Sequence, residues 1–251
     1  MGKLTGKKAL ITGSSSGIGA GVAVAFVAEG ADVVINFPDD AQRENAHQVL
    51  AEIEAAGGHG FAVQADVALE EDAVKLVDES LSTLGRIDIL VNNAGIAHAG
   101  VIEEISVAMW DRMIAVHLRS QFLVTRRVIP LMYENNYGKI INTASQLAYK
   151  GAPGFTHYTA AKGAIISLTR SLALEVGERN ICVNAVAPGA TKTPILANVP
   201  DALMEEIRQS IPKKRLAEIE DIVPTYVFLA SQESNHYQGQ CLSPNGGDVF
   251  L

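Results

Sequence analysis

Residues 9–19 read ALITGSSSGIG, and this stretch decides the fold that we expect. An apolar run ends in a turn rich in glycine and serine, and a helical pattern begins inside that turn. Gly13 permits a tight turn, Gly17 lets the backbone approach a pyrophosphate, and Gly19 lets helix and strand pack closely. The N-terminus of the helix offers free N–H groups and a positive dipole end. The order strand, loop and helix predicts a dinucleotide-binding unit, with a plain glycine–serine turn as the alternative.

Short apolar runs alternate with longer helical patterns through the rest of the chain. We predict strands at 9–11, 32–36, 60–65, 87–91, 138–143, 181–186 and 241–243, and helices at roughly 17–29, 40–57, 70–84, 107–135 and 157–178. Apolar strands that alternate with helices form a parallel sheet covered on both faces. Residues 188–215 contain four prolines and read as irregular, which is typical of a lid or binding loop.

Composition narrows the classes of function. The 251 residues carry a net charge of −8, which argues against nucleic acid as the main partner. Two cysteines imply no disulfide framework, and Cys182 lies in an apolar run where we expect it to be buried. We expect no metal site, because no cluster of ligands has the usual spacing. No apolar run reaches the roughly 18 residues of a membrane span, so we expect no membrane partner and a cytoplasmic protein.

Tyr158 and Lys162 form a Tyr-x-x-x-Lys motif, thirteen residues after Ser145. Positions four apart share one face of a helix, so the phenol and the ammonium can lie close together. A free tyrosine has a pKa near ~10, and a neighbouring positive charge favours the phenolate. Ser145 can bind the substrate oxygen while Tyr158 moves the proton. The three side chains therefore suit proton transfer at a carbonyl or alcohol oxygen.

Further motifs occur in a fixed order around these residues. They are Thr12-Gly-x-x-x-Gly17-x-Gly19, the pair Asp66-Val67, Asn92-Asn93-Ala94-Gly95, Ser145 with Tyr158-x-x-x-Lys162, and Pro188-Gly189. In these motifs the chain resembles the classical short-chain dehydrogenases/reductases over essentially its whole length. The resemblance implies an α/β fold over 1–251, a single Rossmann-type domain with a doubly wound parallel sheet flanked by helices. It also implies a nicotinamide cofactor and hydride transfer between that cofactor and a carbonyl or secondary alcohol.

The resemblance also implies roles for individual residues. Tyr158 would be the acid/base, Ser145 would orient the substrate oxygen, and Lys162 would bind the nicotinamide ribose and lower the pKa of Tyr158. Asn92 would support the central strand. The expected cofactor-binding residues are Gly13, Ser15, Ser16, Gly17, Ile18, Gly19, Asn36, Phe37, Asp66, Val67, Asn93, Ala94, Gly95, Tyr158, Lys162, Pro188, Gly189, Thr191 and Thr193.

His117 departs from the family pattern. The family usually has an asparagine at this place, and that asparagine is thought to hold a water that passes protons to the lysine. Histidine can donate and accept hydrogen bonds and can titrate near neutral pH, so His117 is a candidate catalytic residue in the same relay. The alternative is a histidine that merely packs in a helix interface.

The cofactor is predicted to be NAD, with NADP possible. A cation often binds the 2′-phosphate of NADP. Family members that use NADP often carry a basic residue where Ser16 stands here. The turn 36–40 after the second strand contains Asp39 and Asp40 and no base, and the first base is Arg43. Two nearby acids would repel a phosphate.

The predicted substrate is a small ketone, sugar or secondary alcohol. The expected pocket has few fixed charges, and its lining is Ile96, Ala97, His98, Gln146, Leu147, Gly151, Ala152, His157, Ala190, Ile195 and Leu196. The alternative is a 3-oxoacyl carrier-protein or acyl-CoA reductase. Related carrier-protein reductases dock through bases near 130 and 174, where this chain has Pro130 and Leu174, although Arg126, Arg127 and Arg170 lie nearby.

Two further classes of function and an assembly state complete the predictions. A cofactor-binding regulator without turnover is a distant alternative, and the intact Ser145, Tyr158 and Lys162 argue against it. A structural module would not need these motifs. The resemblance implies a homotetramer in which 107–135 and 157–178 pair with copies of themselves. Segment 163–176 is apolar on more than one helix face, which fits such burial.

Overall fold

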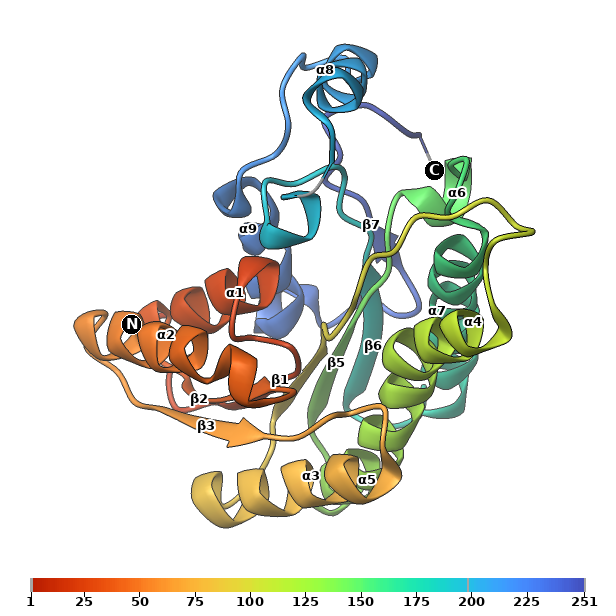
Figure 1. The fold of residues 1–251 in the computed structure, drawn as a ribbon. Helices are drawn as coiled ribbons and strands as arrows, with labels where there is room; N and C mark the ends of the chain where they lie inside the picture. The colour runs from red at the N-terminus through yellow and green to blue at the C-terminus, as the bar shows by residue number, and fades with distance from the viewer. Residues whose placement is uncertain (1, 198, 251) are drawn as a thin grey trace.

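The computed structural model describes residues 2–197 and 199–250 and contains one parallel sheet of seven strands (Figure 1). The strand order is β3-β2-β1-β4-β5-β6-β7, so the direction of winding reverses between β1 and β4. The strand bounds are β1 Lys8–Ile11, β2 Asp32–Phe37, β3 Gly60–Gln64, β4 Ile89–Asn92, β5 Gly138–Thr143, β6 Ile181–Val186 and β7 Cys241–Leu242. The predicted doubly wound α/β fold is confirmed. Ligands of such sheets bind at the carboxyl ends of the strands, beside the point of reversal.

Helices cover both faces of the sheet (Figure 1). Their bounds are α1 Gly17–Ala28, α2 Arg43–Ala55, α3 Glu70–Leu84, α4 Val107–Ile114, α5 Ser120–Asn135, α6 Leu147–Lys150, α7 Thr156–Glu175, α8 Asp201–Ser210 and α9 Ile219–Ala230. Side chains of α1, α2 and α9 form the core on one face, and those of α3, α5 and α7 form the core on the other. Cys182 is buried on β6, as predicted. In the described part of the chain, every helix is too short or too polar to cross a bilayer.

The predicted helix 107–135 is interrupted by one wide, π-helical turn at Ala115–Arg119. Single π-turns inside α-helices are frequent at functional sites, and this one carries His117. The extra residue in the turn changes the direction in which His117 projects, and its ring is buried. The helical period alone could not indicate such an insertion.

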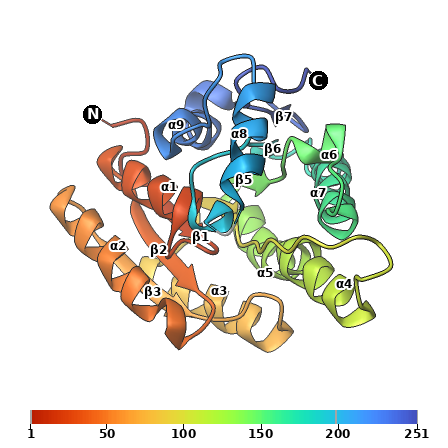
Figure 2. The same ribbon diagram turned by 45° about the horizontal axis from the view of Figure 1, so that its top comes forward.

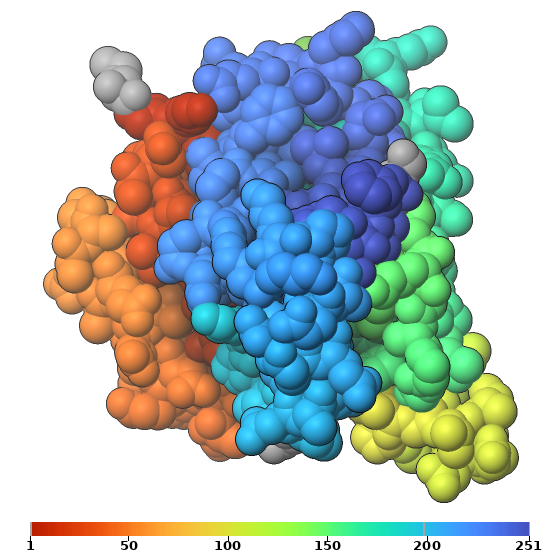
Figure 3. All heavy atoms as spheres, turned by 90° about the horizontal axis from the view of Figure 1, so that it is seen from above, coloured from red at the N-terminus to blue at the C-terminus, as the bar shows by residue number. Residues whose placement is uncertain are grey.

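Helices α6, α8 and α9 were not predicted from the sequence. The segment 188–215 was predicted to be irregular, but it contains the short 3₁₀ turn Pro194–Leu196 and the helix α8. Helix α9 contains Pro224, and a proline inside a helix removes a backbone hydrogen bond. A reciprocal capping box between Glu218 and Asp221 and the burial of one face of α9 offset that loss. Viewed from above, the segment around α8 lies across the middle of the face where the strands end (Figure 3).

Candidate functional site

The glycine loop between β1 and α1 packs against the end of β4. Gly13 adopts a φ of 59°, and a Cβ on it would lie 2.5 Å from the Cα of Ala94. A Cβ on Gly19 would lie 2.4 Å from Nδ2 of Asn93, which donates hydrogen bonds to the carbonyls of Thr12 and Gly13. Side chains are therefore excluded from both positions, as the close turn and close packing predicted from the sequence require.

Asn36 lies behind this loop. Its Oδ1 accepts from the N–H of Gly13 at 3.1 Å, and its Nδ2 donates to the carbonyls of Val63 and Ala65 at 3.2 and 3.0 Å. The side chain is buried, and backbone groups occupy its polar atoms. Asn36 therefore supports the loop, and its cofactor contact stays a prediction.

The start of α1 offers the donors that a pyrophosphate needs. Ser16 is the N-cap residue, and its side chain makes no capping hydrogen bond, so it leaves the first N–H groups of the helix open. Ser15 donates to Oε1 of Gln42 at 3.3 Å, and Ile18 packs on the core. Thr193 lies over the loop, with its Cγ2 3.4 Å from the position of a Cβ on Gly17. This cradle of glycines and open donors fits a dinucleotide.

The turn after β6 closes the site on its other side. Thr193 donates to the carbonyl of Thr191, and Thr191 donates to that of Gly189. The N–H of Gly189 donates to the carbonyl of Pro244, and the carbonyl of Pro188 accepts from the N–H of Gln146. These contacts join the predicted nicotinamide turn to the C-terminal segment and to the loop that carries Ser145.

The adenosine side of the site lies at the ends of β2 and β3. Phe37 is buried at the end of β2, and the guanidinium of Arg43 lies 5.6 Å from its ring centre. Arg43 pairs with Asp40 at 2.5 Å and donates to Oε1 of Gln64 at 2.6 Å. Arg43, the first base after this turn, is therefore already held by an acid.

Asp66 and Val67 follow β3 on the same edge of the sheet. Asp66 accepts a hydrogen bond from Arg112 of α4 at 2.8 Å and from the N–H of Ala68 at 3.1 Å. Val67 is buried in the core below. Gly95 follows β4, and a Cβ on it would lie 2.6 Å from Cε1 of His117. The predicted adenine and nicotinamide contacts thus lie along one continuous edge.

Ser145, Tyr158 and Lys162 meet at the carboxyl end of β5. Lys162 donates from Nζ to the carbonyl of Thr143, the last residue of β5, at 2.7 Å. The same Nζ lies 5.6 Å from the ring centre of Tyr158. Ser145 follows two residues after Thr143, and its hydroxyl oxygen accepts from the N–H of Leu147 at 3.2 Å. The spacing on α7 thus brings the phenol and the amine together, as the sequence indicated.

Burial dominates the protonation of this group. It lowers the pKa of Lys162 to about 7, and it raises the pKa of Tyr158 above its usual value, against a smaller lowering by a hydrogen bond with Ser145. The sequence predicted that Lys162 lowers the pKa of Tyr158, and that role of Lys162 stays a prediction.

His117 contacts the loop after β4. Its Nε2 lies 3.0 Å from the N of Ile96 and 2.8 Å from the O of Ile96, and its ring packs edge-on against Tyr158 at 5.2 Å. One ring nitrogen can serve only one of these groups at a time. Its Nδ1 has no partner within the described residues. Burial, together with the charge of Lys162, lowers the pKa of His117 well below its usual value, so the ring is neutral near pH 7.

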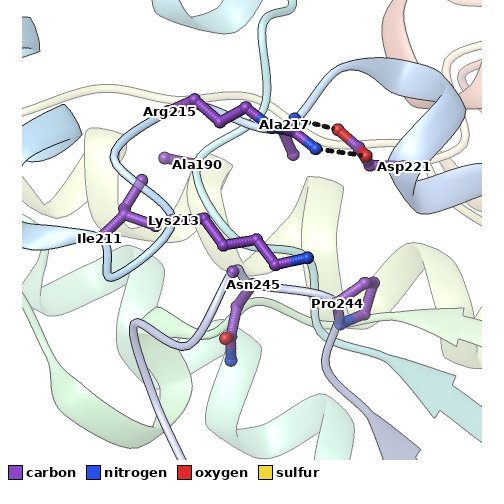
Figure 4. Close-up of a pocket in the computed structure, with 9 residues that line it drawn as sticks. Ala190, Ile211, Lys213, Arg215, Ala217, Asp221, Pro244 and Asn245 are labelled. Atoms are coloured by element: carbon purple, nitrogen blue, oxygen red, sulfur yellow. Dashed lines mark hydrogen bonds and ion pairs between the residues drawn. The ribbon is translucent and has the colours of Figure 1, made fainter.

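The other predicted pocket residues are only partly gathered. His157 is buried beside His98, with ring centres 6.2 Å apart, and no cluster of three metal-ligating side chains exists in 2–197 and 199–250. A separate hollow of about 140 Å³ lies behind the nicotinamide turn, and Figure 4 shows Lys213 reaching along it toward Pro244. Of its lining residues, Ala190 was predicted to line a pocket, and the others come from segments far apart in the chain.

Comparisons with known proteins agree with this geometry. A family model described as enoyl-(acyl carrier protein) reductase matches residues 13–248. The 3-oxoacyl-[acyl-carrier-protein] reductase FabG of Staphylococcus epidermidis is 37% identical over 96% of this chain and 98% of its own. The 3-ketoacyl-(acyl-carrier-protein) reductase of Brucella melitensis, solved with NADH, has a TM-score of 0.91 and 38% identity over 98% of this chain and 100% of its own. A putative NAD(P) dependent gluconate 5-dehydrogenase of Beutenbergia cavernae, solved with NADP, has a TM-score of 0.91 and 36% identity over 98% of each chain.

Proposed function

This chain belongs to the short-chain dehydrogenase/reductase family, and from that premise we propose that it interconverts a small ketone and a secondary alcohol. It is an NAD(P)-dependent oxidoreductase that acts on alcohol and keto groups. The observation that carries the finer proposal is the meeting of Ser145, Tyr158 and Lys162 at the end of β5, beside the cradle of glycines.

Each residue of the site would have a distinct task. The bound cofactor would supply or accept the hydride. Ser145 would hold the substrate oxygen, and Tyr158 would give it a proton during reduction or take one during oxidation. Lys162, held by the carbonyl of Thr143, has donors left for the ribose hydroxyls. The first N–H groups of α1 would hold the pyrophosphate.

A panel of substrates tests the proposed class. The oxidation of NADH or NADPH is followed by absorbance at 340 nm. It should be faster with small ketones and hydroxyketones than with 3-oxoacyl thioesters. The thioester reaction is the second candidate, because relatives that the chain resembles are named carrier-protein reductases. However, Arg126 and Arg127 already pair with Glu70 and Asp78, which leaves less positive charge for an acidic carrier. Faster turnover of thioesters would make the carrier-protein or acyl-CoA reductase the better proposal. No turnover of any substrate would favour a non-catalytic regulator.

His117 is proposed to act as a positioning residue for the loop that begins at Ile96. An asparagine can pair with both the N–H and the carbonyl of Ile96, since its side chain has a separate acceptor and donor. We therefore expect His117→Asn to keep most of kcat, whereas His117→Ala should lower it by about tenfold or more through loss of positioning. Steady-state rates of both variants test this positioning role. Equal losses of kcat in His117→Asn and His117→Ala would contradict it.

NAD is the proposed cofactor. The 2′-phosphate of NADP would have to displace Asp40 from Arg43, with Asp39 alongside. We expect NADH to bind more tightly than NADPH at equal salt. Asp40→Ala should free Arg43 to pair with the phosphate. The ratio of the Kd for NADPH to the Kd for NADH should then fall by about tenfold. Fluorescence titration of both reduced cofactors measures the ratio. Tighter binding of NADPH by the parent protein would contradict the proposal.

The protein is proposed to be a homotetramer with D₂ symmetry. Apolar side chains remain exposed on the helices expected to pair: Leu174 of α7 is 85% exposed and Val107 of α4 is 77% exposed, with Phe122 of α5 half exposed. Light scattering should show four times the subunit mass of 26.6 kDa. Val107→Glu with Phe122→Glu should dissociate the assembly, because buried unpaired charges are costly. A stable, active species of subunit mass would rule the tetramer out.

Two predictions from the sequence remain as proposals without further support. Residues 188–215, with α8, would form the substrate loop of a single domain that spans 1–251. A cytoplasmic location stays a prediction from composition.

A further inference from the structure

A carboxylate near the C-terminus fixes the side chain next to Ser145. Gln146 donates from Nε2 to Oδ2 of Asp248 at 2.6 Å, and Lys150 donates to Oδ1 and Oδ2 of Asp248 at 2.8 and 2.6 Å. The side chain of Asp248 is only 6% exposed. An ionised carboxylate only accepts, so the amide of Gln146 must turn its NH₂ group toward Asp248. The carbonyl oxygen Oε1 therefore faces away from Asp248.

That oxygen is a buried acceptor without a partner. Gln146 is 4% exposed, and its Oε1 makes no hydrogen bond within the described residues. Folded proteins rarely leave a buried acceptor unpaired, because it loses its hydrogen bonds to water without replacement. A donor from outside the chain would satisfy Oε1 in the working enzyme.

Gln146 lies beside the residue that is proposed to hold the substrate oxygen. It follows Ser145 directly, and its N–H donates to the carbonyl of Pro188 in the nicotinamide turn. Asp248 lies beside α6, where it binds Lys150, and Figure 2 shows the C-terminal segment near this helix. Ser145, whose hydroxyl has to meet the substrate, is itself only 7% exposed. The burial of Gln146 is therefore comparable to that of Ser145.

We propose that Gln146 determines specificity: its Oε1 accepts a hydrogen bond from a second hydroxyl group of the substrate. This inference rests on the proposed function and names its substrate class, which is hydroxyketones and vicinal diols. Keto, ether and thioester oxygens bring no donor, and an apolar acyl chain would leave Oε1 unpaired. Asp248 and Lys150 are positioning residues that act through Gln146.

Binding without turnover tests the assignment. The Tyr158→Phe protein with oxidised cofactor is titrated by calorimetry with butane-2,3-diol and with butan-2-ol, which differ by one hydroxyl. The diol should bind at least about tenfold more tightly, because a site with a buried acceptor discriminates against a ligand that lacks the donor. In Tyr158→Phe with Gln146→Leu, the ratio should fall to near one. The proposal is overturned if the ratio of the two Kd values stays the same in the variant with Gln146→Leu. It is also overturned if Tyr158→Phe alone gives a ratio near one or does not bind the diol.

A second variant tests the orienting role of Asp248. Asp248→Asn keeps the size of the side chain but can donate to Oε1, so the amide of Gln146 can turn round. The diol preference should then fall, while Asp78→Asn, which alters an exposed ion pair with Arg127, should leave it unchanged. An unchanged preference in Asp248→Asn would overturn the positioning role. The ratio is measured by binding and does not depend on turnover. If the diol preference is found but no ketone of the panel is reduced, only the proposed reaction is contradicted.

Discussion

Tyr158→Phe is expected to lower kcat by at least about 10²-fold, because the variant removes the group that exchanges a proton with the substrate oxygen. The ring of Tyr158 packs against His117 and Phe155, and phenylalanine keeps that packing. Cofactor binding should therefore change little. Steady-state rates with a ketone that the parent reduces, together with Kd values for the reduced cofactor, measure the two effects separately.

Tyr133→Phe serves as the matched control. Tyr133 lies on α5, where its ring stacks with Arg179 at 4.1 Å, and the substitution keeps that contact. Its kcat should equal that of the parent. Undiminished turnover in Tyr158→Phe would show that another group moves the proton, and Ser145 would then be the first residue to test.

Lys162→Met is expected to remove a pH dependence of stability. The pKa of Lys162 falls from 10.5 in the unfolded chain to about 7 in the folded protein, because the amine is buried. Between these values the unfolded state binds more protons than the folded state, so stability rises with pH from about 7 toward 10.5. Below about 7 the full cost of burying the charged amine is present. The shift corresponds to roughly 5 kcal/mol of unfolding free energy, as an order of magnitude.

Urea unfolding of the cofactor-free parent and of Lys162→Met at several pH values tests this. The difference in unfolding free energy between the two proteins isolates Lys162 from the other groups that titrate above pH 9. The unfolding free energy of the parent should increase relative to that of Lys162→Met as the pH rises. Lys75→Met, an exposed change on α3, should give a constant difference. A constant difference for Lys162→Met as well would mean that the amine keeps an ordinary pKa in the fold.

Local patterns were sufficient to predict the sheet and the cradle of glycines. Strands such as Ile181–Val186 are buried along their whole length, which a continuous apolar run indicates directly. Gly13 and Gly19 are required by close backbone contacts at a strand-to-helix turn, and such turns have a fixed spacing in the sequence. Helix α9 was missed because Pro224 interrupts its pattern, and long-range packing rather than local propensity holds it.

The remaining features depend on contacts between distant residues. Asp248 and Gln146 are 102 positions apart, and no local pattern relates them. Asn36 is a polar residue at the end of a strand, where a sequence cannot show whether its side chain faces the ligand or the loop. The pKa of Tyr158 depends on how deeply the folded chain buries the phenol, and this burial outweighs the opposite effect of the hydrogen bond with Ser145. Composition and spacing predict which groups meet, but burial decides their charge.

Transfer of deuterium from the cofactor to the product tests the central claim most directly. Reduced cofactor labelled at C4 of the nicotinamide is mixed with the protein and with the best ketone or hydroxyketone of the panel, and the alcohol is analysed by mass spectrometry. We predict one deuterium on the carbinol carbon when the transferred position carries the label, and none when the label is on the opposite face. Product without deuterium from either labelled cofactor would contradict direct hydride transfer and the function proposed for this site.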